Sequence, residues 1–536
     1  MLAKGSKYKK IIIVSLCALL VLSLSGCRQK KTTTKTSTKS VELTIWRSAD
    51  SNEAFTDLIN NYRQDNPGVT INYVGLETHP EWKTNPDLYR QETIDALATG
   101  RGPDIWSVRN DWMPADHLKL RAMPDNLLGS LSKDSQDQKS SNVKLLQKLF
   151  VPVATKDTVY ECGVNAQAMA LGTLATANLE QCPVYGLPLS VDSLGLYINQ
   201  GIMESASQAL GDTNKLTKNL STEDVKTLRN IMSNGPKTWS EVVKIVPYVT
   251  VSDGNTITRS AIAMGLGANI EQAPNIISTL LFQNGTEKIV TDDLRSANFQ
   301  NAKGGEVSSA YPGQGAIKFY TYFASRELGG KANPLYTWSK DFAPQGARQA
   351  FVDGNLAMII ENSAFWATLK ATNIKFTPAI VNMPQLESAA NPTSYSTYWV
   401  EGVTNNSKNA DVAWDFIAYA ATKGVRSYLS NTKRPPELIN SAGEYDTDAT
   451  QQQVFQGQAL IADSWYKGPD ANETDTIFRN WADGIVLRGV NVAEATNTAA
   501  SQLTTLLQSA ASAAPAAAPA TSSTADTTTP APAASQ

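Results

Sequence analysis

Cysteine 27 is the residue of this chain whose chemistry follows most directly from its neighbours. It closes the sequence Leu24-Ser25-Gly26-Cys27, which ends an apolar run that begins at Ile11 and follows four lysines. The run is shorter than the roughly 20 residues of a membrane-spanning helix, so it is typical of an export signal. The pattern resembles a bacterial lipobox, in which Cys27 is acylated once residues 1–26 are removed. The alternative is an ordinary cleaved signal or a short anchor with an incidental cysteine.

Two cysteines remain in the exported part of the chain besides Cys27. Cys17 lies inside the apolar run, which leaves Cys162 and Cys182. Exported proteins meet an oxidising environment, so these two are a candidate disulfide, with two buried free thiols as the alternative. The chain has only two histidines, His79 and His117, and neither falls in a Cys/His cluster. The sequence therefore predicts no metal site and no cofactor.

Motifs for covalent catalysis are sparse. The sequence contains no H-E-x-x-H, no G-x-S-x-G and no G-x-x-x-x-G-K-[ST]. Residues 430–433 match S-x-x-K, but the S-D-N and K-T-G motifs that accompany it are missing. Acidic residues are abundant, so a carboxylate pair about 5 to 10 Å apart, as in a glycosidase, stays open as an alternative. The sequence favours a binding protein over an enzyme.

The charge balance differs along the chain. The whole chain carries 47 basic and 50 acidic residues, a net charge of -3. Removal of residues 1–26 takes away four lysines, and segment 28–39 holds five further basic residues and no acid. The body is therefore clearly acidic, which argues against a nucleic-acid partner. The basic segment is placed where it would meet anionic lipid headgroups.

The two ends of the chain are low in complexity. Residues 27–40 are rich in Lys, Thr and Ser and predict a flexible tether, and residues 509–536 predict a disordered Ala/Pro/Thr tail. What lies between them is longer than a single hydrophobic core usually accommodates. Two or more lobes are therefore expected.

The elements that must position any site alternate between strand and helix. Val41 to Trp46 predicts a strand, and the helix after it buries one face through residues at i, i+3, i+4 and i+7 from Phe55. Val69 to Val74 predicts a second strand, Asp87 to Ala98 a second helix and Asp104 to Val108 a third strand. This order is typical of a parallel α/β sheet, whose ligands lie beyond the carboxyl ends of the strands.

The same alternation recurs later in the chain. The sequence predicts strands in Leu187 to Asn199, in Ile262 to Leu266 and in Leu356 to Ile360, and helices in Trp239 to Val246, in Ala347 to Phe351 and around Ala413 to Ala420. A second α/β lobe follows. Residues 129–181 fit the pattern poorly and are expected to be an insertion.

Six segments, taken in order, resemble one protein family. They are L-T-I-W-R-S-A-D (43–50), A-T-G-R-G-P-D-I-W (98–106), V-Y-G-L-P-L-S-V-D-S-L-G-L-Y-I-N (184–199), P-K-T-W-S-E-V (236–242), F-V-D-G-N-L-A-M-I-I-E-N-S-A-F-W (351–366) and N-N-S-K-N-A-D-V-A-W-D-F-I (405–417). The chain resembles extracellular solute-binding protein family 1, the maltose-binding-like lipoprotein receptors of ABC importers.

The resemblance implies a two-lobe fold of the periplasmic-binding-protein type 2, with a cleft between lobes that are discontinuous in sequence. We expect an N-terminal lobe from residues 41–188 and 397–432 and a C-terminal lobe from residues 189–396 and 433–508. The connecting strands are expected near Pro188 to Val191, Tyr395 to Val400 and Lys433 to Pro436.

The resemblance also places the ligand contacts. A sugar combines hydroxyls with C–H faces, so its site pairs polar side chains with aromatic rings. The expected contacts are Arg47, Ser48, Asp50, Ser51, Asn110, Asp111, Trp112, Asp192, Ser363, Phe365, Trp366, Trp399 and Trp465.

Several of these residues have a structural alternative. Asp50 or Ser51 could cap the helix that begins near Asn52, Asp192 could form a salt bridge at the hinge, and Trp366 could be core. Trp46, Trp239 and Trp414 are expected in the core.

The resemblance implies an extracytoplasmic receptor of an ABC importer that binds a sugar or oligosaccharide. Its partners would be that solute, the permease subunits and the membrane through the lipid anchor, with the receptor a monomer that binds no nucleic acid. The alternatives are a surface-anchored carbohydrate-active hydrolase and a binding lipoprotein without a transporter.

Overall fold

The structure is a computed structural model, and its described residues are 40–161, 180–210, 220–286, 288–302, 311–387, 392–440 and 449–513. The chain divides into two units, Met1–Ser40 and Val41–Gln536. Cys27, the export signal, the tether before Ser40 and the tail after residue 513 lie outside the described residues.

The N-terminal lobe is built on a five-stranded sheet in the order β2-β1-β3-β13-β4. Its strands are β1 (Val41–Trp46), β2 (Val69–Val74), β3 (Ile105–Arg109), β4 (Leu187–Pro188) and β13 (Trp399–Val403). Strand β1 runs parallel to β2 and β3, whereas β13 runs antiparallel to β3 and β4. The expected parallel core of the sheet is present, and a returning antiparallel strand completes it.

Helix α2 shows why the sequence forms this lobe. It spans Asn52–Asp65 and buries Phe55, Leu58 and Tyr62, which lie on one face at helical spacing. These side chains pack with Leu43 and Ile45 of β1 in one hydrophobic cluster. The helix ends before Pro67, which cannot continue it.

The C-terminal lobe is built on a second five-stranded sheet, in the order β11-β5-β10-β7-β6. Its strands are β5 (Gly195–Asn199), β6 (Val251–Asp253), β7 (Thr256–Ile262), β10 (Leu356–Glu361) and β11 (Pro378–Val381). Every residue of β10 is buried, because strands flank it on both sides. The expected strand over Ile262 to Leu266 is misplaced: β7 ends at Ile262, and the apolar residues beyond it are buried without being in a strand.

Three segments lead from one sheet to the other. The chain leaves the first sheet after β4, returns between β12 (Ser394–Tyr395) and β13, and leaves again after α18 (Val425–Thr432). Ser193 and Ser396 form a β-bridge that joins the first two segments. Strand β12 pairs with β14 (Ala462–Asp463) in a separate two-stranded sheet. The two lobes are therefore discontinuous in sequence, while the residue at which each begins stays a prediction.

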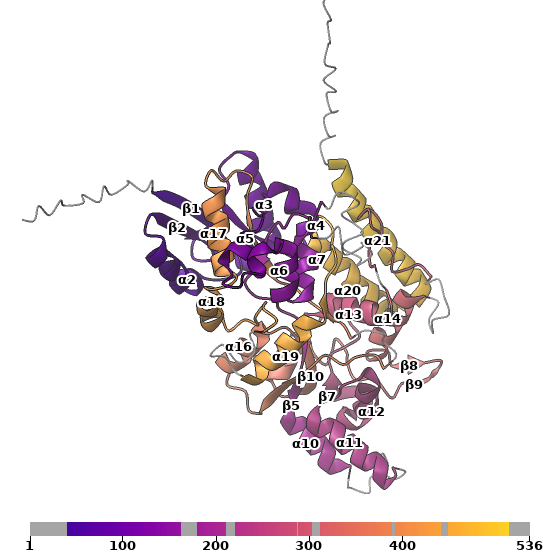
Figure 1. The fold of residues 1–536 in the computed structure, drawn as a ribbon. Coiled ribbons are helices and arrows are strands. Elements are labelled where there is room, and N and C mark those ends of the chain that lie inside the picture. The colour runs from indigo at the N-terminus through magenta and orange to yellow at the C-terminus, as the bar shows by residue number, and fades with distance from the viewer. Residues whose placement is uncertain are drawn as a thin grey trace, which may run out of the picture. The chain divides into compact units, whose positions relative to one another are not determined.

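The expected insertion at residues 129–181 is, in its described part, integral to the N-terminal lobe. Helices α5 (Leu127–Leu131), α6 (Asn142–Leu149) and α7 (Pro152–Thr158) lie there (Figure 1). Leu145 and Leu146 of α6 are buried in the same cluster as β1 and α2. The strand-and-helix pattern missed these helices because they are short.

The other described elements complete the two lobes. They are η1 (Pro80–Lys83), α3 (Pro86–Ala98), α4 (Met113–Asp116), η2 (His117–Lys119), η3 (Asp137–Lys139), α10 (Gln200–Ala209), α11 (Thr222–Asn234), α12 (Trp239–Val249), α13 (Ala273–Gln283), α14 (Pro312–Tyr322), β8 (Glu327–Leu328), β9 (Lys331–Ala332), α15 (Ala347–Val352), α16 (Ala364–Ala371), α17 (Ala410–Ala420), α19 (Ala449–Leu460), α20 (Ala471–Arg488) and α21 (Val492–Ala513).

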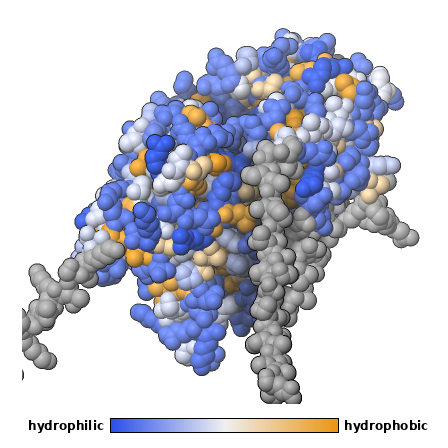
Figure 2. Space-filling view, turned by 90° about the horizontal axis from the view of Figure 1, so that it is seen from above, coloured by the Kyte–Doolittle hydropathy of each residue, from blue (hydrophilic) through white to orange (hydrophobic). Residues whose placement is uncertain are grey.

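One face of the molecule shows no large apolar patch. The face seen in Figure 2 is mostly hydrophilic, and its hydrophobic residues are scattered. Among the described residues, no helix has both the length and the apolar character needed to cross a membrane.

Candidate functional site

A cavity of about 1270 Å³ lies between elements of the two lobes. One wall is the first part of α2 with the loop before it, and the other is α16, which follows β10 of the C-terminal lobe. The end of α18 and residues 431–434, where the chain leaves the N-terminal lobe, complete the lining. Figure 1 shows α18 between α2 and α16. The cavity is thus bounded by both lobes and by one of the segments that connect them.

The lining combines charged groups of both signs with one large aromatic ring. Its residues are Asp50, Ser51, Glu53, Ala54, Thr56, Asp57, Ser363, Ala364, Trp366, Ala367, Lys370, Ala371, Asn431, Thr432, Lys433 and Arg434. Of the expected contacts, Asp50, Ser51, Ser363 and Trp366 are among them. The remaining expected contacts are not.

Asp50 is the most heavily bonded carboxylate of the lining. Its Oδ1 accepts hydrogen bonds from Nε and Nη2 of Arg434 at 2.9 and 2.8 Å. Its Oδ2 accepts from Nε of Arg47 at 2.9 Å and from the Tyr428 hydroxyl at 2.8 Å. Burial alone would raise the pKa of Asp50, but the charges of Arg434 and Arg47 outweigh it and lower the pKa to about 2. Asp50 is therefore ionised and fastens the connecting segment to the N-terminal lobe.

Arg47 lies behind Asp50 and does not line the cavity. It is 1% exposed, and its guanidinium also contacts Glu401 of β13 and the Ser107 hydroxyl of β3. Its guanidinium donates four hydrogen bonds to buried acceptors instead of facing the cavity. The expected ligand contact from Arg47 is thus replaced by a structural role, in which it holds the β1–α2 loop in place. Ser48 is likewise buried and does not line the cavity, and its hydroxyl has no hydrogen-bond partner in the described part of the chain.

Asp192 positions the start of α16. It lies in the first connecting segment and accepts hydrogen bonds from the backbone N–H of Ser363 at 3.1 Å and from its hydroxyl at 2.8 Å. Burial raises the pKa of Asp192, while the bonds from Ser363 counteract that rise. These bonds anchor α16 to the first connecting segment, close to the stiffening role considered for Asp192, and no salt bridge to Asp192 is present among the described residues.

Trp366 provides the aromatic surface of the cavity. It is half-buried, and the Nζ of Lys370, one helical turn further along α16, lies 5.1 Å from its ring centroid. Its indole N–H is buried, and none of the described residues accepts a hydrogen bond from it. The neighbouring Phe365 points the other way: it is 2% exposed and packs against Tyr197 with ring centroids 5.3 Å apart. The two aromatic residues expected in this loop therefore separate into one cavity residue and one core residue.

The loop after β3 forms a separate cluster away from the cavity. Asp111 is buried and pairs with Arg109, whose Nε donates to its Oδ1 at 3.0 Å. Trp112 is fully buried, and it meets Trp399 edge to face at a centroid separation of 5.6 Å. Asn110 donates to Asp157 at 2.9 Å and accepts from the backbone of residue 398. The expected contacts from this loop are occupied by the protein itself, although the Trp399 ring stays half-buried.

Trp465 belongs to the core of the C-terminal lobe. It is 7% exposed, donates through Nε1 to the Ser278 hydroxyl at 3.1 Å and stacks on Phe478 at 5.4 Å. The expectation of a stacking residue does not agree with this placement, because a polar stretch of sequence concealed a buried ring. Trp46 shows the opposite error, since it is half-buried at the end of β1 and not in the core.

Four charged residues of the cavity lining are not among the expected contacts: Glu53, Asp57, Lys370 and Arg434. Glu53 and Asp57 lie four residues apart on α2, and Lys370 lies four residues after Trp366, so each pair shares a helix face. Arg434 falls in the third connecting segment that the resemblance implied. Helical spacing from the expected contacts would have found all of these except Arg434.

One of the two cysteines considered for a disulfide can be placed. Cys182 is buried and disulfide-bonded. Cys162 lies outside the described residues, so its pairing with Cys182 stays a prediction.

The comparisons with known proteins agree with this architecture. A family model for bacterial extracellular solute-binding proteins matches residues 48–427. The fold is similar to the sugar-binding protein MalE from the phytopathogen Xanthomonas citri, with a TM-score of 0.61 and 15% identity over 88% of this chain and 98% of that one. The comparison with curated proteins gave no match.

Two further solved structures show the same fold. The cyclic alpha-maltosyl-1,6-maltose binding protein from Arthrobacter globiformis has a TM-score of 0.58 and 15% identity, over 88% of this chain and 99% of that one. An ABC transporter solute-binding protein from Thermotoga lettingae TMO, bound with alpha-D-tagatose, has a TM-score of 0.54 and 18% identity, over 87% of this chain and 100% of that one.

Proposed function

Because the chain belongs to the bacterial extracellular solute-binding protein family, we propose that it is the receptor of an ABC importer and binds a sugar or oligosaccharide by closing its two lobes. The observation that carries the proposal is the cavity between α2 and α16, which both lobes line. The family places the protein on the extracytoplasmic side. The neighbours named for maltose-type sugars and for tagatose support the ligand class.

The lining suits a carbohydrate. A pyranose presents C–H groups that lie well on an aromatic face, and Trp366 offers such a face at the edge of the cavity. Ser51, Asn431 and Glu53 offer hydroxyl, amide and carboxylate groups for the sugar hydroxyls. A cavity of about 1270 Å³ has room for more than one sugar ring.

Lobe closure follows from the connections. The lobes are joined by three short segments, and a ligand that touches both walls binds the closed form more tightly than the open form. The Asp50–Arg434 contact ties the third segment to the N-terminal lobe, so one end of that segment is fixed. We propose the lobe boundaries at residues 41–188 with 397–432 and at 189–396 with 433–508.

The hydrolase alternative is weaker. A glycosidase needs a carboxylic acid whose pKa is raised so that it can protonate the leaving group. The pKa of Asp50, the buried carboxyl of the cavity, is lowered to about 2 by its two arginine partners, so Asp50 does not suit the role of that acid. The family match supports a binding protein, and we propose binding without chemical conversion of the solute.

A ligand screen tests this function. Thermal unfolding of the purified chain is measured with maltose, cyclic alpha-maltosyl-1,6-maltose, tagatose and a wider carbohydrate panel. A ligand that binds only the folded state raises its stability, by about 2.7 kcal/mol at a hundred times Kd. Each ligand that stabilises the protein is then recovered and identified. Recovery of an unaltered sugar supports the receptor, whereas a hydrolysed product supports the enzyme, and a panel without any stabilising carbohydrate contradicts the sugar class.

We also propose that acylated Cys27 holds the receptor at the outer face of the cytoplasmic membrane through the basic tether. Cys27→Ala removes the acylated thiol, so the chain is expected to move from the membrane fraction to the medium or periplasm. Immunoblots of fractionated cells measure the distribution, with Cys17→Ala in the same apolar segment as the control. Unchanged membrane association of Cys27→Ala would contradict the anchor.

A further inference from the structure

Away from the cavity, three side chains of the N-terminal lobe converge in an arrangement suited to a metal ion. We propose that His79, Glu81 and Glu92 form a surface site for a divalent transition-metal cation such as Zn²⁺. His79 and Glu81 lie at the start of η1, and Glu92 lies on α3. None of the three lines the cavity. The site is therefore separate from solute binding.

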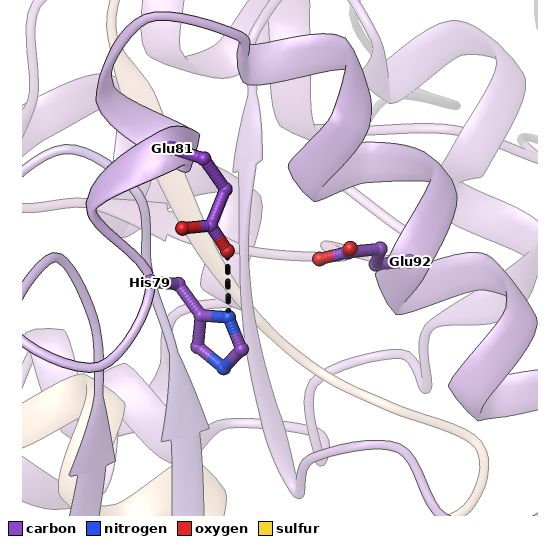
Figure 3. A group of neighbouring side chains, drawn as sticks. All are labelled: His79, Glu81 and Glu92. Atoms are coloured by element: carbon purple, nitrogen blue, oxygen red, sulfur yellow. Dashed lines mark hydrogen bonds and ion pairs between the residues drawn. The ribbon is translucent and has the colours of Figure 1, made fainter.

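The spacing of the donor atoms fits a single ion. One ligand atom from each side chain lies within 4.8 Å of the other two. Nδ1 of His79 and Oε1 of Glu81 are 3.0 Å apart, and Glu92 extends from α3 toward both of them (Figure 3). Ligand atoms of a tetrahedral zinc ion, each about 2.1 Å from the metal, lie about 3.4 Å from one another. The three ligand atoms are therefore close enough together to bind one ion after small side-chain adjustments.

A buried tryptophan orients two of the three ligands. Trp82 is 1% exposed, and its ring stacks on the His79 imidazole at a centroid distance of 4.1 Å and an interplanar angle of 8°. Its Nε1 donates to Oε2 of Glu92 at 2.6 Å. Trp82 is itself held by Tyr89 and Trp46 at 4.9 and 5.9 Å. Partners that fix the direction of a ligand in this way are characteristic of metal sites.

The donor set selects the class of ion. One imidazole nitrogen with two carboxylates suits Zn²⁺, Cu²⁺ or Ni²⁺, while Mg²⁺ and Ca²⁺ prefer all-oxygen surroundings. Three protein ligands leave a fourth position for water. The sequence predicts no metal site because neither histidine falls in a Cys/His cluster. Here a single histidine is joined by a glutamate from another helix, at a spacing that no zinc motif describes.

Calorimetric titration of the full chain, prepared without a histidine tag and treated with a chelator, tests the site. Zn²⁺ is expected to bind with one-to-one stoichiometry and at least about tenfold more tightly than Mg²⁺ or Ca²⁺. His79→Ala is expected to lose more than about tenfold in Zn²⁺ affinity, and Trp82→Phe, which keeps the stack but loses the N–H donor, about tenfold. His117→Ala, which removes the other histidine, is the matched control and is expected to bind as the unmodified chain does.

A second variant distinguishes loss of a metal ligand from loss of the fold. Glu92→Gln keeps an amide oxygen that can accept from Trp82, so it should fold normally while its Zn²⁺ affinity falls. Thermal unfolding without metal checks that both variants are folded. Wild-type Zn²⁺ affinity in His79→Ala and Glu92→Gln, an equal loss in His117→Ala, or no Zn²⁺ binding by the unmodified chain would each overturn the proposal.

Discussion

At the scale of single residues, the carboxylate of Asp50 carries the strongest physical constraint near the cavity. It is shared by the buried Arg47 and Tyr428 and by the half-buried Arg434, so three polar groups depend on one negative charge. Removing one member of such a set leaves charges buried without compensation. The arrangement fixes the floor of the cavity before any ligand arrives.

Asp50→Asn is therefore expected to lower the free energy of unfolding by about 3 kcal/mol at neutral pH. Urea denaturation measures this change, and Glu53→Gln, an exposed neighbour on the same cavity wall, is the control with little effect. A loss no larger in Asp50→Asn than in Glu53→Gln would contradict the buried network.

The contribution of Asp50 to the free energy of unfolding depends on pH, and the direction of that dependence follows from its lowered pKa. The pKa of Asp50 falls from 3.8 to about 2 on folding, so its contribution to stability is present above pH 3.8 and is lost as pH falls through about 2. A shift of this size corresponds to about 2 kcal/mol. The stability difference between the unmodified chain and Asp50→Asn should thus shrink between pH 5 and pH 2, and a constant difference over this range would contradict the assignment.

Trp366 is the residue on which sugar recognition is expected to depend. Loss of its ring in Trp366→Ala should weaken binding of a confirmed sugar by about 1 to 3 kcal/mol, because a stacked aromatic face is removed. Calorimetry measures the affinity, and chemical denaturation checks the fold. Trp465→Ala is the matched control, since its ring lies in the core: it should lose stability, and its folded fraction should keep its affinity. A loss of stability with unchanged affinity in Trp366→Ala, together with a loss of affinity in Trp465→Ala, would contradict this assignment of the two tryptophans.

At the scale of helices and strands, the sequence predicted long amphipathic elements well and short or polar ones poorly. The helical spacing of apolar residues on α2 predicts that Phe55, Leu58 and Tyr62 are buried. The continuous apolar run of β10 predicts its burial in the same way. Helix α6 was missed because it has only 8 residues, too few to show a period clearly. The error at Trp465 has a related cause, since burial there comes from contacts such as Ser278 that are far away in sequence.

Helix α6 provides a test of the corrected fold. Leu146 is fully buried in the N-terminal core, so Leu146→Ala should lower the free energy of unfolding by about 2 to 5 kcal/mol. Leu118→Ala, whose side chain is 62% exposed, is the control and should change it little. Denaturation with urea compares the two variants. Equal, small effects would mean that residues 129–161 form a peripheral insertion after all.

At the scale of the whole molecule, the two-lobe organisation could be inferred from the order of segments, and the two five-stranded sheets bear it out. The choice of ligand contacts could not be made in the same way. Whether Arg47 or Asn110 faces the cavity depends on which buried partners take up its hydrogen bonds, and those partners, Glu401 and Asp157, lie far away in sequence. Ser363 and Trp366, which line the cavity, could be predicted because a buried strand precedes them.

Solution scattering with and without a confirmed sugar tests the central claim, that solute draws the lobes together, most directly. The measurement is made on the unmodified chain and on Trp366→Ala at the same sugar concentration. The account predicts a smaller radius of gyration for the unmodified chain when sugar is bound, and a smaller change, or none, in Trp366→Ala. An unchanged radius at saturating sugar, with binding verified by calorimetry in the same sample, would contradict closure of the lobes on the solute.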